Sequence, residues 1–214
     1  MMLLEEIYKT TKAQHSEYFN LRIQRSLSWL RKAVELQADY DFQFLSLWIG
    51  LNALYVQENE DSLDQQALSQ FLHLILSKDQ EKRIFQILLG RYEVTLHALL
   101  DNQYLTQHFW DYQHNKISQS DCREMLKQQK IEIQKAVEQQ DIMKLLLEVF
   151  KCFTTLRQQI LQGGVSYASA VCRKQMQESC SLFSALLNTF IYILLEHAAV
   201  MDSGKAYYPV VQVN

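Results

Sequence analysis

The sequence predicts an all-α fold, and three observations lead to that prediction. The chain has only 5 glycines and 1 proline in 214 residues, whereas folds built from strands and tight turns use these residues often. Apolar residues recur at helical spacing along most of the chain. Several of the resulting segments begin at a side chain that can cap a helix, or end at a glycine. We therefore expect long helices joined by few tight turns.

Two helices are expected near the N-terminus, at about residues 17–37 and 41–57. Asp39 or Asp41 can cap the second helix, which is apolar almost all round and is expected to be the most buried. Asn52 is a polar exception within it. The first helix has an apolar face of Tyr18, Leu21, Ile23, Leu27, Leu30 and Val34, and a basic face of Arg22, Arg25 and Lys32.

The region from about residue 60 to 140 is more polar, and we predict a helical elaboration inserted between two halves of a core bundle. Helices are expected at about 64–76, 79–100 and 121–139. Their starts match a capping-box pattern, at Ser62-x-x-Gln65, Ser77-x-x-Gln80 and Asp121-x-x-Glu124. Between them lies an aromatic cluster of Tyr104, Phe109, Trp110 and Tyr112. Such side chains can stack on nucleic-acid bases, but packing at a corner between helices is the interpretation that we favour.

Two long helices are expected near the C-terminus. The first spans about residues 141–162, begins at Asp141 and stops at the Gly163–Gly164 pair. The second spans about 173–200. Its polar residues recur every three or four positions, which is typical of an amphipathic helix with one solvent-exposed face rather than of a membrane span. The length of 214 residues fits one domain, residues 1–214.

Composition and motifs limit the function. The net charge of −3 excludes a generally basic nucleic-acid binder, so any contact with a polyanion requires a local patch. Glu5 and Glu6 interrupt the apolar start of the chain, so we expect no secretory signal and a cytoplasmic location. Phosphate-binding loops, dinucleotide glycine patterns and zinc-protease motifs are absent from the sequence, so no cofactor or metal is expected. The four cysteines are expected to be free thiols, because their spacing does not match that of metal ligands. They are Cys122, Cys152, Cys172 and Cys180.

The end of the 141–162 helix carries an unusual polar cluster. Arg157 lies at the edge of the apolar stripe, and Gln158 and Gln162 share one face at i, i+4. One interpretation is structural, in which Arg157 pairs with an acid and Gln162 caps carbonyl groups. The other is a binding site for an anion, because a guanidinium matches phosphate oxygens and stays charged.

Five stretches, taken as a set and in this order, are similar to a known family. They are Arg25–Glu35, Phe44–Tyr55, Asn102–Trp110, Leu156–Met176 and Gly204–Val211. Together they resemble the HEPN superfamily (higher eukaryotes and prokaryotes nucleotide-binding domains). The resemblance implies a four-helix up-and-down core, made here by the helices at 17–37, 41–57, 141–162 and 173–200. It also implies a homodimer, because the active members are metal-independent ribonucleases whose motifs meet across a dimer.

The resemblance assigns roles to individual residues. The family motif is an arginine, usually followed by a polar residue, and a histidine four to six residues later. In this chain Arg157 takes the arginine position, Gln158 the polar position and Gln162 the histidine position. Asn52 is expected near the same cleft. Arg173 and Lys174 are expected to add positive charge for binding.

The glutamine at position 162 changes what such a site can do. Cleavage by a ribose 2′-hydroxyl needs a group that moves a proton, and histidine suits that task because its pKa lies near neutrality. A glutamine amide has no usable pKa. We therefore expect an RNA-associated or defence protein of ribonuclease ancestry that does not cleave RNA. The alternatives are a non-catalytic dimerisation or protein-interaction module, with a toxin–antitoxin or regulatory partner, and a phosphate- or nucleotide-binding domain.

Overall fold

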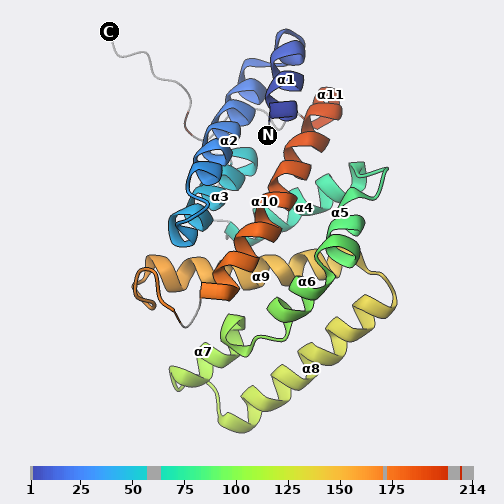
Figure 1. Ribbon diagram of the computed structural model, residues 1–214. Helices are drawn as coiled ribbons and strands as arrows, with labels where there is room; N and C mark the ends of the chain where they lie inside the picture. Colours follow the sequence, from blue (N-terminus) through green and yellow to red (C-terminus); the bar gives the residue numbers. More distant parts are fainter. Residues whose placement is uncertain (1, 57–63, 171–172, 202–207, 209–214) are drawn as a thin grey trace. The chain divides into compact units, whose positions relative to one another are not determined.

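The computed structural model describes residues 2–56, 64–170, 173–201 and 208. This part of the chain is all-α, as predicted, and contains no strand (Figure 1). The residues form two compact units, one made by Met1–Glu81 with Phe183–Asn214 and the other by Lys82–Leu182. The helix expected at 141–162 belongs to the second unit.

The first unit is built around a pair of antiparallel helices, α2 and α3, which lie side by side in Figure 1. A Cβ atom at Gly50 would lie 3.2 Å from Leu187 Cδ2 and 3.4 Å from Trp29 Cβ, so this glycine allows the helices to approach closely. The helices of the unit are α1 (Met2–Thr11), α2 (Glu17–Glu35), α3 (Tyr40–Tyr55), α4 (Asp64–Lys78), the later part of α10 (Arg173–Glu196) and α11 (Ala198–Met201). Helix α1 is an addition to the helices that the sequence predicted.

Helix α3 is mostly buried, as its composition predicted. Phe44 and Leu47 are fully buried, and the ring of Phe183 meets that of Phe44 edge to face at 5.6 Å. Of the two proposed caps, Asp39 is the one used, because its carboxylate accepts a hydrogen bond from the Phe42 amide at 3.3 Å. Phe42 itself is exposed, so the helix is not buried on every side.

The prediction of a basic surface on α2 is wrong for Arg22, because this residue is buried. Its Nη1 donates to the carbonyl oxygens of Val56 at 3.0 Å and Leu54 at 3.4 Å. These carbonyls lie at the end of α3, where the helix leaves acceptors without an intrahelical partner. Arg22 therefore caps α3 rather than contributing to a basic surface, and Lys32 forms an ion pair with Glu35 at 3.0 Å.

The buried face of α2 is not the apolar face that the sequence predicted, because it is rotated around the helix axis. Tyr18 and Val34 are exposed, whereas Phe19 and Ala33 are buried. Periodicity indicates that a helix has an apolar face, but the exact edge of that face depends on which neighbours pack against it. The buried residues of α2 are Phe19, Arg22, Ile23, Ser26, Leu27, Leu30 and Ala33.

The second unit contains several short helices and two long ones. Its elements are α5 (Arg83–Gln86), a π-helical segment (Ile87–Arg91), α6 (Glu93–Leu100), a 3-10 turn (Gln103–Leu105), α7 (Gln107–Gln113), α8 (Gln119–Glu138), α9 (Ile142–Leu161) and the beginning of α10. The single helix predicted at 79–100 is wrong. The chain adopts a left-handed conformation at Lys82, with φ of 54°, and widens into the π-helical segment, which contains Gly90.

Only part of the predicted capping chemistry is confirmed. Ser77 does not start a helix, because α4 continues to Lys78 and the Ser77 hydroxyl donates to the Leu74 carbonyl at 2.7 Å. Helix α8 begins earlier than predicted, because Ser118 is its N-cap and Asp121 is the third helical residue of a capping box. Ser62 lies outside the described residues.

The turn between α8 and α9 offers a test of backbone strain. Gln140 is exposed and has φ of 54°, a conformation that glycine adopts at lower cost. We expect Gln140→Gly to raise the free energy of unfolding by about 0.5–1 kcal/mol, measured by urea denaturation. Gln139 has φ of −85°, so the control Gln139→Gly should lower it by about the same amount. A loss of stability in Gln140→Gly would contradict this account of the turn.

Helix α10 is, among the described residues, the one helix long and apolar enough to cross a membrane by length and composition, and 61% of its most apolar window is buried inside the protein. The predicted polar stripe is confirmed. Its residues are exposed or half-buried; they are Gln177, Ser181, Ser184, Asn188, Tyr192 and Glu196.

Candidate functional site

The candidate site lies at the C-terminal end of α9. The helix starts as predicted at Asp141, whose carboxylate accepts from the Lys144 amide at 3.0 Å. It ends in two hydrogen bonds, from Gly163 N to the Ile160 carbonyl and from Gly164 N to the Gln159 carbonyl. This pattern is a Schellman motif, and Gly163 has the positive φ of 70° that the motif requires. The diglycine therefore fixes where the polar cluster ends.

The three motif residues occupy successive parts of this helix end. Arg157 and Gln158 are half-buried in the last turns of α9, and Gln162 is exposed as its C-cap. The backbone N–H of Gln162 donates to the carbonyl of Gln158 at 2.9 Å. This bond is an ordinary backbone bond of the helix, so capping of carbonyl groups by the Gln162 side chain stays a prediction, and that side chain is accessible to solvent.

Two amide contacts bring distant segments to this helix end. Gln159 Nε2 donates to the Tyr104 carbonyl at 2.9 Å, and Asn102 Nδ2 donates to Gln175 Oε1 at 2.9 Å. The segment 102–104 thereby links the last turn of α9 to the first turns of α10. Two of the stretches that carry the family resemblance, Asn102–Trp110 and Leu156–Met176, thus meet within the second unit. Gln159 is recognisable in the sequence as one of the amides around Arg157, whereas nothing in the local pattern distinguishes Asn102 and Gln175.

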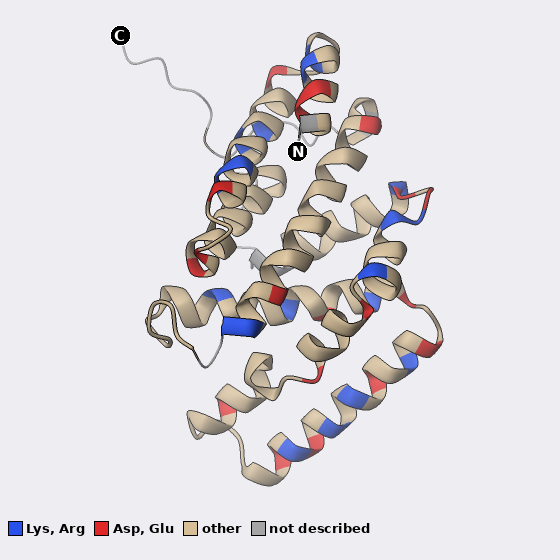
Figure 2. Cartoon of the chain, in the orientation of Figure 1, with Lys and Arg blue, Asp and Glu red and all other residues tan. Residues whose placement is uncertain are grey.

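The two basic residues predicted to assist binding begin α10. Arg173 is half-buried, and Lys174 is exposed. Lys174 Nζ lies 3.8 Å from Glu178 Oε1, and a pair so exposed adds little stability. Figure 2 shows basic residues both in the C-terminal half of α9 and at the start of α10.

Asn52 belongs to the first unit, while Arg157 belongs to the second. The side-chain oxygen of Asn52 accepts a hydrogen bond from the Tyr55 hydroxyl at 3.2 Å. Its contribution to the cleft around Arg157 therefore stays a prediction.

The aromatic cluster packs against itself, as we favoured, but not completely. The Tyr104 and Phe109 rings meet edge to face at 4.9 Å, and Phe109 and Trp110 do so at 5.2 Å. Trp110 Nε1 also donates to the Tyr104 carbonyl at 2.9 Å. The Tyr104 side chain remains exposed, so one ring of the cluster is accessible to a partner.

The cysteines of the described residues are buried. Cys122, Cys152 and Cys180 are buried, and Cys172 lies outside the described residues. Burial raises the pKa of Cys152 to about 12, and the negative charge of Glu148 adds to the effect, so this thiol is a poor nucleophile near neutral pH. Among the described residues no group of three or more His, Cys, Asp or Glu side chains could hold a metal ion.

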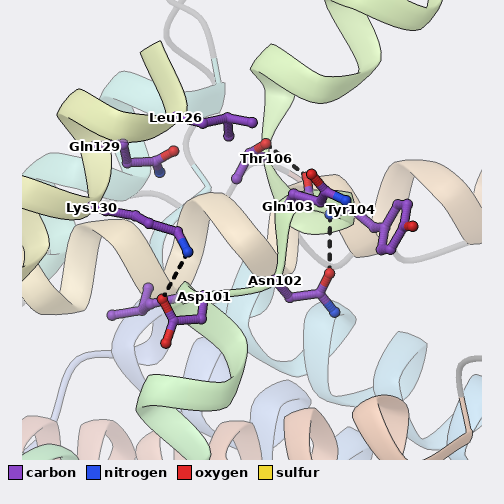
Figure 3. Close-up of a pocket in the computed structure, with 9 residues that line it drawn as sticks. Asp101, Asn102, Gln103, Tyr104, Thr106, Leu126, Gln129 and Lys130 are labelled. Carbon is purple, nitrogen blue, oxygen red and sulfur yellow. Dashed lines mark hydrogen bonds and ion pairs between the residues drawn. The ribbon is translucent and has the colours of Figure 1, made fainter. Parts of the chain in front are cut away.

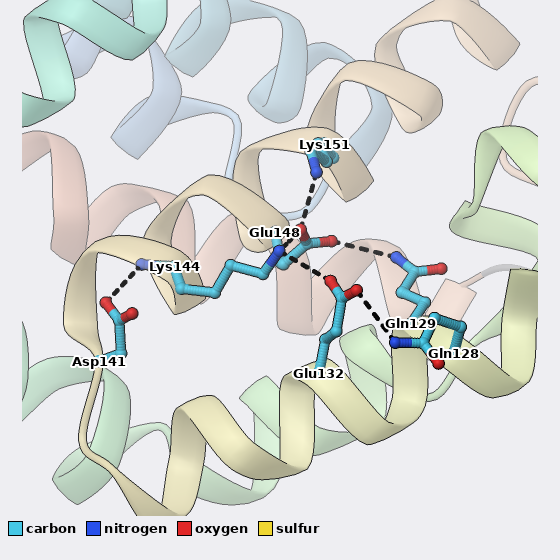
Figure 4. Close-up of polar contacts among 7 residues, drawn as sticks. All are labelled: Gln128, Gln129, Glu132, Asp141, Lys144, Glu148 and Lys151. Atoms are coloured by element: carbon cyan, nitrogen blue, oxygen red, sulfur yellow. Dashed lines mark hydrogen bonds and ion pairs between the residues drawn. The ribbon is translucent and has the colours of Figure 1, made fainter.

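A buried carboxylate, missed by the sequence analysis, joins α8 to α9 (Figure 4). Glu148 is only 3% exposed. Its oxygens accept hydrogen bonds from Lys151 Nζ at 2.7 Å and Gln129 Nε2 at 3.1 Å, and Lys144 Nζ lies 3.5 Å away. The i, i+4, i+7 order of Lys144, Glu148 and Lys151 within an apolar face was a signal that could have identified it.

The environment of Glu148 gives acid-dependent stability. Burial alone would raise its pKa, but the hydrogen bond and charge of Lys151, together with Gln129 and Lys144, outweigh burial and hold the pKa below its ordinary value of 4.5. The unfolded state therefore binds the proton more readily. The stabilisation is complete above the ordinary value and is lost as the pH falls through that value toward the lowered one.

We expect Glu148→Gln to lower the free energy of unfolding by about 1–3 kcal/mol at pH 7. The deficit should shrink as the pH falls below the ordinary carboxyl range, measured by urea denaturation at a series of pH values. Glu132 shares Lys144 but is exposed, so the control Glu132→Gln should change stability much less. A deficit that stays constant from neutral to acid pH would contradict the role of the charge.

No family model matches the chain, and no match was found among curated proteins or solved structures. The part of the chain that the structure describes is all-α, and in it a short 3-10 segment joins the arginine-bearing end of α9 to the basic start of α10.

Proposed function

We propose that this chain is a HEPN-like protein that associates with RNA, as a homodimer, and does not cleave it. The observation that carries the proposal is the composition of the α9 end: a half-buried arginine, an adjacent glutamine and an exposed glutamine at the C-cap. Arginine can hold a phosphate through two parallel hydrogen bonds. Neither glutamine can accept and release a proton near neutral pH, so the cluster can bind the substrate of a ribonuclease without completing the reaction.

The partial charges of the helix ends indicate whether an anion would bind at the end of α9 or at the start of α10. The C-terminal end of α9 carries the partial negative charge of its carbonyl groups. This charge repels a phosphate and attracts the positive guanidinium of Arg157. The first turn of α10 carries partial positive charge and begins with Arg173 and Lys174. A phosphate is therefore expected between Arg157 and the start of α10.

Binding of a fluorescently labelled single-stranded RNA, followed by anisotropy, tests the proposal. Arg157→Met should weaken binding about tenfold or more, because a charge-assisted hydrogen bond contributes about 1.5–3 kcal/mol. The control is Arg123→Met, which removes an exposed cation from α8 in the same unit and should change binding little. Binding should weaken as salt is added. Equal loss in both variants would show that only the general charge of the unit attracts RNA.

A second candidate is a non-catalytic protein-interaction module, favoured by one observation in the first unit. Phe42 and Ile49 are 54% and 40% exposed and lie seven residues apart on one face of α3. Large apolar side chains exposed together are typical of a protein contact surface. Light scattering of Ile49→Lys tests this function. A purified wild-type dimer that becomes a folded monomer in the variant would support it, and an unchanged mass would not.

A further inference from the structure

A pocket of about 320 Å³ lies in the second unit, between α8 and the segment that follows α6 (Figure 3). Its volume is at the lower end of the range of about 300–1,000 Å³ that small-molecule sites occupy. Residues 100–104 and Thr106 line one side, and Leu126, Gln129 and Lys130 of α8 line the other. The pocket shares the segment 102–104 with the candidate site, but nothing in the RNA-binding proposal uses these α8 side chains.

Opposite charges face each other across the pocket. Lys130 Nζ lies 3.5 Å from Asp101 Oδ1, and the two side chains are 62% and 67% exposed. An ion pair so well solvated contributes little to stability. A ligand can therefore separate the two groups at low cost if it supplies each with a better partner.

The amide of Gln129 is oriented by a group outside the pocket. Its Nε2 donates to the buried carboxylate of Glu148 at 3.1 Å. Its carbonyl oxygen therefore points the other way, toward the Thr106 side of the pocket (Figures 3 and 4). The Glu148 network thus orients a hydrogen-bond acceptor on the Thr106 side of the pocket.

Other lining groups are already engaged. Asn102 Nδ2 donates to Gln175, and its oxygen accepts from the Tyr104 amide at 3.0 Å. The Thr106 hydroxyl donates to the Gln103 carbonyl at 2.8 Å. The strongest ligand groups are therefore two acceptors, Asp101 and the Gln129 oxygen, and one cation, Lys130. Leu100 and Leu126 add apolar surface beside them.

We propose that this pocket binds a small zwitterion of the α-amino-acid class. The ligand ammonium donates to the Asp101 carboxylate, and the ligand carboxylate accepts from Lys130. The apolar part of its side chain lies against Leu100 and Leu126. A purely anionic ligand leaves Asp101 repelled and a purely cationic ligand leaves Lys130 repelled, so the charge pattern selects a molecule that carries both signs.

Isothermal titration of the full chain with each of the standard L-amino acids at millimolar concentration tests the proposal. We expect at least one to bind. For that compound, the analogue lacking the carboxylate and the analogue lacking the amine should each bind about tenfold more weakly or worse. Asp101→Asn and Lys130→Met should cause similar losses. Lys127→Met is the matched control, because Lys127 is exposed one turn earlier on α8 and does not line the pocket.

Several results would overturn the zwitterion proposal. One is the absence of heat with every amino acid, and another is equal affinity for the two analogues. A third is equal loss in Lys130→Met and Lys127→Met. The substituted side chains are exposed, and circular dichroism of each variant verifies that the helices persist. RNA binding by Lys130→Met, measured separately, should match that of Lys127→Met, so failure of this proposal is distinguishable from failure of the RNA-binding proposal.

Discussion

Replacing Gln162 by histidine is expected to increase the rate of RNA cleavage by about 10²–10⁴-fold, the usual contribution of one positioned acid or base. The side chain at this position is exposed at the end of α9, five residues after Arg157. An imidazole there can exchange a proton with a ribose hydroxyl while the guanidinium holds the adjacent phosphate. Cleavage of a labelled single-stranded RNA, resolved by gel electrophoresis, measures the change.

The comparison needs two controls. Gln162→Asn keeps an amide at the C-cap and should not increase cleavage. Adding Arg157→Met to Gln162→His should remove the gain, because the phosphate then loses its cation. The gained activity should depend on pH near neutrality, where histidine titrates. A folded Gln162→His protein that binds RNA and leaves it intact would make ribonuclease ancestry of this site untenable.

The second large effect is expected in the core of the first unit. Phe44→Ala should lower the free energy of unfolding by about 3–5 kcal/mol. The Phe44 side chain is fully buried and packs against Phe183 and Trp48, with ring centroids at 5.6 Å and 6.4 Å. Its removal leaves a cavity that two rigid rings cannot fill, and the loss is large beside a typical total stability of about 5–15 kcal/mol.

Phe42→Ala is the matched control for this prediction, since Phe42 lies two residues earlier on α3 and is exposed. The same change of side chain should there cost less than about 1 kcal/mol, because little apolar surface leaves a packed environment. Both variants are measured by urea denaturation. Similar losses in the two variants would show that burial does not determine the stability of this helix.

The sequence was sufficient for the fold class because helical periodicity is a local property. The long helices α2, α3, α9 and α10 begin within two residues of where periodicity and capping chemistry predict. The Gly163–Gly164 stop is also correct, since a left-handed residue after a helix strongly favours glycine. Failures occur where tertiary contacts determine the outcome. The interruption of the 79–100 region and the burial of Arg22 against the end of α3 have no local pattern.

The candidate site was predictable only for the residues that lie on the same helix. Arg157, Gln158 and Gln162 stand on one helix, so their spacing was informative. The contacts from Gln159 to Tyr104 and from Asn102 to Gln175 join residues 55 and 73 positions apart in the chain. The pocket beside α8 likewise joins two segments whose separate sequences are unremarkable. Long-range pairs of this kind depend on how helices pack, and periodicity does not specify that packing.

The central claim is that Arg157 retains RNA while no group at position 162 can move a proton. The most direct measurement incubates the unmodified chain with a labelled single-stranded RNA and records the bound fraction and the RNA length together. The account predicts RNA that is bound and remains at full length, with binding weakened by Arg157→Met. Rapid shortening of the RNA by the unmodified chain, abolished by Arg157→Met, would contradict it and assign the proton transfer to another residue.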